Sequence, residues 1–380
     1  MKITEIETFL VPPRWCFLRI ATDEGITGWG EPILEGRAHT VAAAVDEFAD
    51  YLVGQDPLRI EDHWQVLTKG GFYRHGPVLS SAVAGVDQAL WDIAGKSLGV
   101  PVHQLLGGAV RDRARMYAHI AVERGDLAEQ AARQVEAGFT AVKVSPAPSS
   151  RLLGTPAAIR RIADTVSGIR ERVGDDVDVA VDLHGRLSLA DARRLLPLLE
   201  PLLPLFVEEP VVPELSGRLG QITSCTTIPV ATGERLYSRW DFRPALDAGV
   251  AVVQPDLSHA GGISEVRRIA ALAEMYDAAL APHCPLGPIA LAASLQVAFA
   301  APNFLIQEQV LFGGPYGRST GLDYLLDTAV FACRDGCLAR PTGPGLGIAV
   351  DEREVRRAAQ AGHRWRTPQV RRDDGSPGEW

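Results

Sequence analysis

The chain has 380 residues, of which 46% are hydrophobic, and this is enough to bury a large core and to form two domains. Its formal net charge of −9, without any Lys/Arg run that contains interleaved aromatic residues, argues against nucleic acid as a partner. The sequence has no apolar run long enough to span a bilayer, and residues 1–6 have the pattern of an amphipathic strand rather than a signal peptide. We therefore expect a soluble protein without a membrane partner.

The cysteines indicate neither a disulfide framework nor structural zinc, because the five are odd in number and lack paired CxxC spacing. A reducing cytoplasm is the expected location. Cys284 is adjacent to His283, which would allow a thiol nucleophile, but its apolar and prolyl neighbours favour a buried and unreactive side chain.

Residues 1–112 are expected to form most of an α+β capping domain. Alternating apolar residues predict a small antiparallel sheet at 2–10, 16–22 and 27–31. Helical periodicity follows at 42–52 and 81–96.

Two loops of this first domain carry candidate substrate-binding residues. The glycine-rich loop 70–77 contains Tyr73, and the loop 35–37 contains Arg37. Each loop is either a surface turn or part of a lid over the active site, since gating loops combine flexible glycines with substrate-facing polar groups. If they form a lid, Arg37 and Tyr73 contact the substrate.

From residue 113 the pattern changes to alternating strands and helices, which predicts an α/β domain, a (β/α)₈ TIM barrel at 113–325. Its eight strands are expected at 115–118, 140–144, 177–182, 205–208, 228–234, 252–256, 279–283 and 304–308. Four helices are expected to begin at the capping residues Asp126, Thr155, Ser188 and Ser238. Residues 326–380 no longer show alternating strands and helices. They are expected to return to the capping domain, with the last residues partly disordered.

Three of the predicted barrel strands end in a carboxylate, at Asp182, Glu208 and Glu234. These residues are 26 apart, about the length of one βα unit, so each lies at the C-terminal end of a parallel strand. Those ends form the mouth of a barrel, where catalytic residues lie. Three carboxylates there predict a hard divalent cation, and Mg²⁺ fits best because it takes few carboxylates and keeps positions open for water or substrate oxygens.

Two histidines are candidate catalytic residues at the same mouth. His184 follows Asp182 by two residues, so the strand period of two keeps both side chains on one face. Asp256 ends predicted strand six and His283 ends strand seven. A carboxylate that accepts a hydrogen bond from one ring nitrogen leaves the other nitrogen free as a base, so we interpret this pair as a catalytic dyad rather than a structural histidine.

Lys143 and Glu308 end predicted strands two and eight. Because lysine is rarely buried unless it is paired, Lys143 is expected to bind a substrate carboxylate, to act as a second base, or to form a structural salt bridge. Glu308 is expected to hold a substrate oxygen, or to donate a proton if neighbouring acids raise its pKa.

The chain resembles the mandelate racemase and muconate lactonizing enzyme branch of the enolase superfamily over essentially its full length. The shared motifs lie at 28–31, 87–96, 182–186, 208–210, 233–235, 254–262 and 281–283. Within that branch the chain is most similar to the sugar-acid dehydratases that act on galactonate. The resemblance implies a modified barrel with a capping domain that the C-terminal segment completes.

The resemblance also implies roles for the site residues. It implies that Asp182, Glu208 and Glu234 bind Mg²⁺. It also implies that His283, oriented by Asp256, removes the C2 proton of a sugar acid, and that His184 protonates the departing 3-hydroxyl. The product would be a 2-keto-3-deoxy acid. Arg186 belongs to one of the shared motifs and is expected to contact the substrate. Relatives form symmetric oligomers, often octamers, so a homo-oligomer is expected.

Three positions and one loop depart from the pattern expected of galactonate enzymes, namely His75, His119, Ser145 and the loop 146–154. They leave the general chemistry unchanged but leave the substrate open, because such groups read the stereochemistry at C4 to C6. One alternative is a dehydratase for another aldonate. Another is a racemase or epimerase in which Lys143 and His283 act on opposite faces of one carbanion, and a third is a non-catalytic sugar-acid binder.

Overall fold

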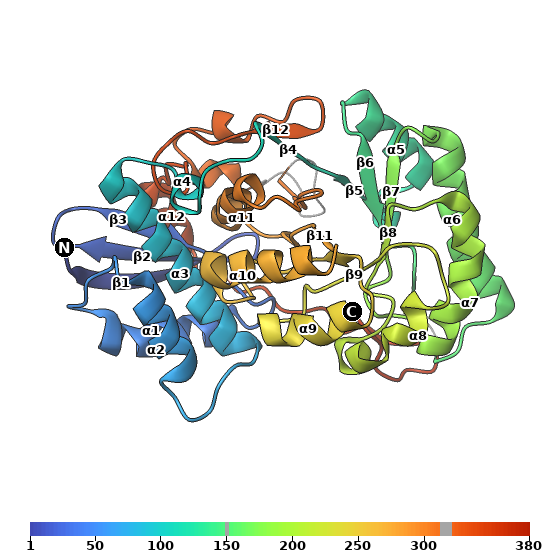
Figure 1. The fold of residues 1–380 in the computed structure, drawn as a ribbon, viewed down its shortest axis with the longest axis horizontal. Helices are drawn as coiled ribbons and strands as arrows, with labels where there is room; N and C mark the ends of the chain where they lie inside the picture. Colours follow the sequence, from blue (N-terminus) through green and yellow to red (C-terminus); the bar gives the residue numbers. More distant parts are fainter. Residues whose placement is uncertain (149–151, 312–320) are drawn as a thin grey trace.

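The computed structural model describes residues 1–148, 152–311 and 321–380. Figure 1 shows a small antiparallel sheet with helices beside the N-terminus, and a larger part in which parallel strands are surrounded by helices. None of the described helices is both long and apolar enough to cross a membrane.

The N-terminal part is built on an antiparallel sheet of three strands in chain order, β1 (Ile3–Val11), β2 (Trp15–Thr22) and β3 (Thr27–Gly30). Two helices pack on this sheet, α1 (Ala38–Leu52) and α3 (Pro77–Leu98), and α2 (Ile60–Lys69) packs on α3. The predicted sheet and helices are confirmed. Helix α3 begins four residues earlier than expected because Pro77 suits a first helical turn, and it ends where Gly99 takes a φ of 68°.

Strand β3 lies very close to α3 and then connects the capping sheet to the barrel. A Cβ atom on Gly30 would lie 2.0 Å from the backbone oxygen of Gly85, so only glycine permits this approach. The next residue, Glu31, is fully buried and accepts hydrogen bonds from the backbone N–H groups of Gly287 (2.7 Å) and Ala290 (2.9 Å) in the barrel.

Seven parallel strands of the barrel form one sheet in the order β11-β10-β9-β8-β7-β6-β5. Their bounds are β5 (Ala118–Ile120), β6 (Ala141–Val144), β7 (Asp178–Asp182), β8 (Phe206–Glu208), β9 (Val230–Thr232), β10 (Val252–Val253) and β11 (Ala279–Leu280). The eighth predicted strand is present as isolated parallel bridges, from Phe304 to Leu280 and from Gln307 to Met116. These bridges join both edges of the sheet and close the barrel.

The first predicted barrel strand was placed wrongly. Instead of one strand at 115–118, the chain forms β4 (Arg113–Arg115), which pairs antiparallel with β12 (Cys337–Ala339), and then β5, which begins at Ala118. The strand is split because residues 113–115 pair with β12, and the side chain of Arg115 forms an ion pair with Asp178 at 2.7 Å.

The barrel interior has an apolar floor. One buried side chain from each of the eight strands contributes to a single cluster, formed by Tyr117, Ala141, Ala180, Phe206, Ala231, Val252, Ala281 and Ile306. Because strand side chains alternate between two faces, the residues two positions further on also point inward, one layer nearer the C-terminal ends of the strands. That next layer contains most of the predicted site residues.

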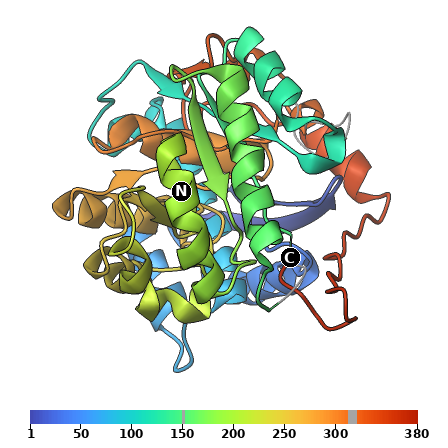
Figure 2. The same ribbon diagram turned by 90° about the vertical axis from the view of Figure 1, so that its right-hand side faces the viewer.

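Helices surround the barrel in Figures 1 and 2, and most follow a strand directly. They are α4 (Val102–Leu105), α5 (Leu127–Glu136), α6 (Pro156–Val173), α7 (Leu189–Leu199), α8 (Gly220–Thr223), α9 (Arg239–Asp247), α10 (Gly262–Met275) and α11 (Pro288–Ala300). Short 3₁₀ turns lie at η1 (Val122–Arg124), η2 (Glu200–Leu202), η3 (Pro213–Arg218), η4 (Leu322–Tyr324) and η5 (Ala329–Phe331).

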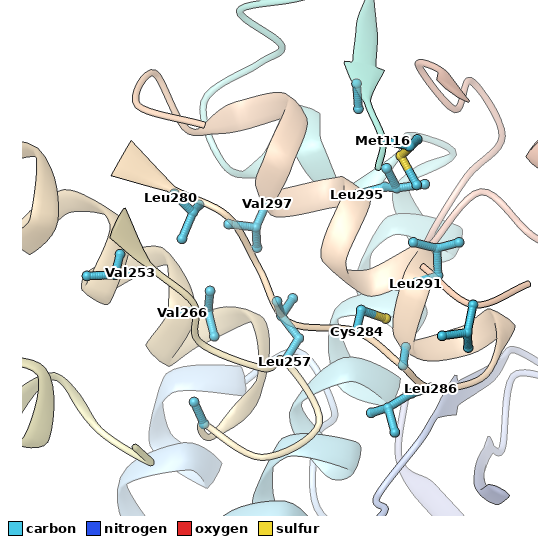
Figure 3. Packing of buried hydrophobic residues seen from close by; sticks show 14 of the residues in the cluster. Met116, Val253, Leu257, Val266, Leu280, Cys284, Leu286, Leu291, Leu295 and Val297 are labelled. Atoms are coloured by element: carbon cyan, nitrogen blue, oxygen red, sulfur yellow. The ribbon is translucent and has the colours of Figure 1, made fainter. Parts of the chain in front are cut away.

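The outer core lies between the strands and α10 and α11, and Figure 3 shows Cys284 within it, near Leu257, Leu286 and Leu291. Cys284 is 2% exposed, and burial raises the pKa of its thiol well above the usual value. A thiol held protonated in an apolar environment is a poor nucleophile, which supports the expectation of an unreactive side chain.

The C-terminal segment returns to the capping sheet. Helix α12 (Glu352–Ala359) packs on β1, and Arg356 pairs with Glu7 at 2.6 Å. This contact agrees with the expected return of the chain, while the domain boundaries after residues 112 and 325 stay a prediction.

Candidate active site

A ring of side chains lies one layer above the apolar floor, with one residue from each strand. Its members are His119, Lys143, Asp182, Glu208, Gly233, Gln254, His283 and Glu308. Each follows a floor residue by two positions, so the strand period explains why all of them face the interior. Glu234 and Asp256 lie just beyond the ring, towards the mouth. The barrel therefore brings together all the predicted metal ligands and catalytic residues; His184 comes from the loop after β7 and lies beside Asp182.

Asp182 on β7 and Glu208 on β8 are register partners, so their carboxylates lie on neighbouring strands at the same level of the barrel. The Lys143 ammonium lies 2.9 Å from both oxygens of Glu208 and 3.6 Å from Asp182. Burial, together with the nearby charge of Asp182, raises the pKa of Glu208 well above its usual value despite Lys143. Burial likewise raises the pKa of Glu234 to about 7. The negative charge of Asp182, Glu208 and Glu234 is therefore greater than the neighbouring cationic groups compensate.

The predicted metal ligands fit Mg²⁺ by donor chemistry, but their oxygens are occupied by other partners. Glu208 faces Lys143, and Glu234 lies 3.3 Å from Nε2 of His283. Within the part of the chain that the structure describes, no three His, Cys, Asp or Glu side chains stand close enough to form a metal site. The three-ligand site thus stays a prediction, and it requires Glu208 and Glu234 to turn from these partners.

Glu209 points away from the ring, as strand alternation predicts. Its carboxylate accepts hydrogen bonds from the backbone N–H of Gly233 (3.3 Å), from Nε of Arg235 (3.0 Å) and from the hydroxyl of Thr232. Glu209 therefore holds the β8 and β9 strand ends together, while its neighbour Glu208 faces the interior.

His283 and Asp256 form the predicted pair. Nδ1 of His283 lies 2.8 Å from Oδ2 of Asp256, whose other oxygen accepts the backbone N–H of Ser258 at 2.6 Å. This arrangement leaves Nε2 facing the interior, 3.3 Å from Glu234 and 3.9 Å from Glu308. Burial lowers the pKa of His283, but the charges of Glu308, Glu234 and Asp256 together raise it to about 10.

His184 lies on the opposite side of the barrel, since it follows the third strand whereas His283 follows the seventh of eight. Its backbone has a φ of 50°, and its N–H donates to Oδ1 of Asp182 at 2.9 Å. The side chain returns to the same residue, with Nε2 at 3.1 Å from Oδ2. Burial lowers the pKa of His184 although Asp182 raises it.

Glu308 contacts Lys143, His119 and one backbone N–H group. Its Oε1 lies 2.8 Å from Lys143 and 2.9 Å from Nε2 of His119, while its Oε2 accepts the backbone N–H of Cys284 at 2.9 Å. Burial raises the pKa of Glu308, but Lys143, His283 and His119 hold it well below the usual value. The condition for a proton-donating Glu308 is therefore not met, and its carboxylate acts as an acceptor in this structure.

A cavity of about 560 Å³ opens above the ring and is large enough for a small-molecule substrate. It is lined by the ring residues Lys143, Asp182, His283 and Glu308, and also by Arg186. Arg186 donates to the backbone oxygen of Ala147 at 3.1 Å, which fixes its side chain at the edge of the cavity.

The structure does not bring Arg37 and Tyr73 to this cavity. Tyr73 is 88% exposed and contacts Phe72 edge-on, because its loop extends into solvent. Arg37 precedes α1 and donates to its neighbour Gly36 at 3.0 Å. The lid interpretation is therefore not supported for either residue.

Family models match most of the chain. Residues 126–355 match the enolase C-terminal domain-like family, and residues 10–107 match the N-terminal domain of mandelate racemase and muconate lactonizing enzyme. The chain belongs to the enolase superfamily. The expected fold, a modified (β/α)₈ barrel with an α+β capping domain, is confirmed.

Curated relatives in the enolase superfamily extend over the whole chain. D-galactonate dehydratases from Variovorax paradoxus and Ralstonia pickettii are each 49% identical over 383 residues, covering 100% of both chains. The D-galactonate dehydratase from Pectobacterium atrosepticum is 48% identical with the same coverage. This similarity identifies the chain as an enzyme of the hydro-lyase class that is similar to the galactonate dehydratases.

Solved structures of enolase superfamily members have the same fold. A candidate galactarate dehydratase from Agrobacterium radiobacter, bound to sodium and L-malate, has a TM-score of 0.91 and 34% identity, with 100% of both chains covered. A mandelate racemase/muconate lactonizing enzyme candidate from Labrenzia alexandrii has a TM-score of 0.89 and 32% identity, covering 97% of this chain and 99% of that one.

Sequence reasoning did not assign several residues that line the cavity. Glu35 and His259 lie 3.5 Å apart at its edge, and Arg235 and Trp380 also line it. His259 and Arg235 belong to shared family motifs, which was a usable signal. Glu35 and Trp380 come from loops far from the barrel strands in sequence, and no local pattern marks them.

Proposed function

We propose that this enzyme is a Mg²⁺-dependent D-galactonate dehydratase that forms a 2-keto-3-deoxy acid and water. The observation that carries the proposal is the position of His283, paired with Asp256, across the barrel from His184. The substrate is proposed because the full-length relatives at 49% identity are named D-galactonate dehydratases. A cation on Asp182, Glu208 and Glu234 would offset their negative charge and stabilise the charge that develops on the substrate carboxylate.

In the first step, Nε2 of His283 takes the proton from C2, and the electron pair of the C–H bond moves towards the carboxylate to form an enediolate. Asp256 holds the proton on Nδ1 at 2.8 Å and so keeps Nε2 as the accepting nitrogen. Despite burial, the charges of Glu308, Glu234 and Asp256 raise the pKa of His283 to about 10, and compensation of these charges by a bound cation would lower it towards the range in which the imidazole is free to accept a proton.

In the second step, the electron pair of the enediolate forms the C2–C3 double bond, and the C3–O bond breaks. His184 donates a proton to the departing 3-hydroxyl, which leaves as water. Because burial lowers the pKa of His184, its protonated form is a stronger acid than an ordinary imidazolium. The resulting enol takes a proton at C3 and becomes the 2-keto-3-deoxy acid.

The racemase alternative requires Lys143 to act as a second base. Its ammonium contacts Glu208, Glu308 and Asp182, at 2.9, 2.8 and 3.6 Å. Burial lowers the pKa of Lys143, but Glu208 and Glu308 raise it well above the usual value. These contacts favour a positioning role for Lys143, which orients two carboxylates, over proton abstraction.

The test is turnover of a set of aldonic acids with Mg²⁺, followed as 2-keto acid formation. We expect galactonate to be the preferred substrate, and we expect His283→Asn to reduce kcat by about 10²- to 10⁴-fold because the base is lost. Exchange and inversion at C2 in D₂O without any keto acid would instead support the racemase. Unchanged turnover by His283→Asn would exclude His283 as the base.

A further inference from the structure

The tail that follows α12, residues 360–380, contacts the capping domain along its course instead of being disordered. The imidazole Nε2 of His363 lies 2.6 Å from the backbone oxygen of Pro13, and the Trp365 ring lies 5.5 Å from the guanidinium of Arg14. The hydroxyl of Thr367 donates to the backbone oxygen of Glu35 at 3.5 Å. The tail therefore follows the two capping-domain loops that contribute Arg14 and Glu35 to the active-site cavity.

The end of the tail turns back through a short hairpin and reaches the cavity. Arg371 and Pro377 form an antiparallel bridge, and the backbone N–H of Gly378 donates to Val370 at 3.1 Å. Trp380 then packs against Trp365, with ring centroids 5.9 Å apart. In Figure 1 the end of the chain accordingly lies away from the N-terminus.

Trp380 lines the same cavity as His184, His283 and Glu308. Its exposure is 45%, whereas Glu308 at the base of the cavity is 1% exposed. Trp380 thus lies at the open end of the cavity, whereas Glu308 lies at its base.

We propose that Trp380 is a specificity-determining residue that contacts the distal carbons of the sugar acid. This inference rests on the proposed function, which places C2 and C3 between His283 and His184. The carbons beyond C3 then extend towards the open end, where an indole offers an apolar face for C–H groups and one N–H donor for a hydroxyl. A shorter acid would end before it reaches Trp380.

The proposal predicts an effect that depends on substrate length. For a six-carbon aldonate that the wild-type enzyme converts, Trp380→Ala should raise KM about ten-fold, because a side-chain contact of this kind discriminates by about that factor. For a four-carbon aldonate, KM should not change. Trp380→Phe should keep most of the affinity for the six-carbon acid, because it retains the aromatic face.

The matched control is Trp240→Ala, since Trp240 is a tryptophan of similar exposure, 50%, on α9 and outside this cavity. It should leave both KM values unchanged, and thermal unfolding of all variants verifies that they fold. Equal KM values for Trp380→Ala and wild type on the six-carbon acid would overturn the inference but not the proposed function. A wild-type enzyme that dehydrates no aldonate would overturn the proposed function and this inference with it.

Discussion

The hydrogen bond between Asp256 and His283 allows a sharp test of the catalytic base through the substitution Asp256→Asn. The side chains have nearly the same shape, and Asp256 is only 1% exposed, so the new amide must occupy the same position. The backbone N–H of Ser258 lies 2.6 Å from Oδ1 and requires an oxygen there. The amide nitrogen would then face Nδ1 of His283 from the position of Oδ2, at about the present 2.8 Å.

An amide nitrogen donates its hydrogen bond, so Nδ1 must accept and the imidazole proton moves to Nε2. Nε2 is the nitrogen that takes the C2 proton, and the substitution therefore blocks the base without removing it. A general base contributes about 10²- to 10⁴-fold, which corresponds to about 3–5 kcal/mol of transition-state stabilisation. We expect kcat to fall by this factor, while KM changes little because Asp256 lies behind His283.

The assay is steady-state 2-keto acid formation from the preferred aldonate, together with exchange of the C2 proton in D₂O. Both should decrease together, since both require proton removal by His283. Asp247→Asn is the control, because Asp247 lies on α9 and bonds Tyr276 rather than a site residue. A kcat within about three-fold of wild type for Asp256→Asn would refute the tautomer argument, since the expected loss is at least about 10²-fold.

Two further predictions concern the metal and the fold. Chelation should abolish turnover, and Mg²⁺ should restore it. Because the folded-state pKa of Glu234 is raised to about 7, the chelated protein should lose stability as pH rises through that value. Mg²⁺ should remove this loss by binding the ionised carboxylate. Thermal unfolding between about pH 5 and 8, with chelator or with Mg²⁺, measures this, and a pH-independent melting temperature in chelator would contradict it. Glu31→Ala should destabilise the protein by about 2–6 kcal/mol, because two buried N–H groups lose their acceptor at about 1–3 kcal/mol each. Denaturant unfolding of this variant beside Glu31→Gln tests it: the amide keeps one acceptor oxygen, so Glu31→Gln should lose less stability than Glu31→Ala, and an unchanged free energy of unfolding for Glu31→Ala would contradict the argument.

Local signals in the sequence were sufficient for three of the four predicted helix caps. Asp126, Thr155 and Ser188 each accept a hydrogen bond from the backbone N–H three residues on, at 2.9, 3.2 and 3.1 Å. Ser238 was expected to do the same, but its hydroxyl instead donates to the side chain of Asp241 at 2.7 Å. Capping depends on residues a few positions apart, so it can be predicted without knowing the rest of the fold.

Features that depend on distant parts of the chain could not be predicted. The split between β4 and β5 depends on β12, which lies more than two hundred residues later in the sequence. The directions of the loops that carry Arg37 and Tyr73 depend on how they pack, and glycine content alone cannot distinguish a lid from an exposed turn. The contact of Trp380 with the cavity likewise depends on the path of the tail. The site residues on strands were predictable because the strand period fixes their direction.

The charges around the ring give a physical reason to expect a cation there. Five carboxylates lie at the mouth, from Asp182, Glu208, Glu234, Asp256 and Glu308. The Lys143 ammonium and a protonated His283 compensate two of them, which leaves three negative charges in a largely buried site. Burial of unpaired carboxylates is unfavourable. In the absence of a cation, only protonation can reduce the negative charge, and the pKa values of Glu208 and Glu234 are therefore raised. A divalent cation would compensate two charges without protonating the ligands, and it would lower the pKa of His283 towards the range in which the imidazole is a base at neutral pH.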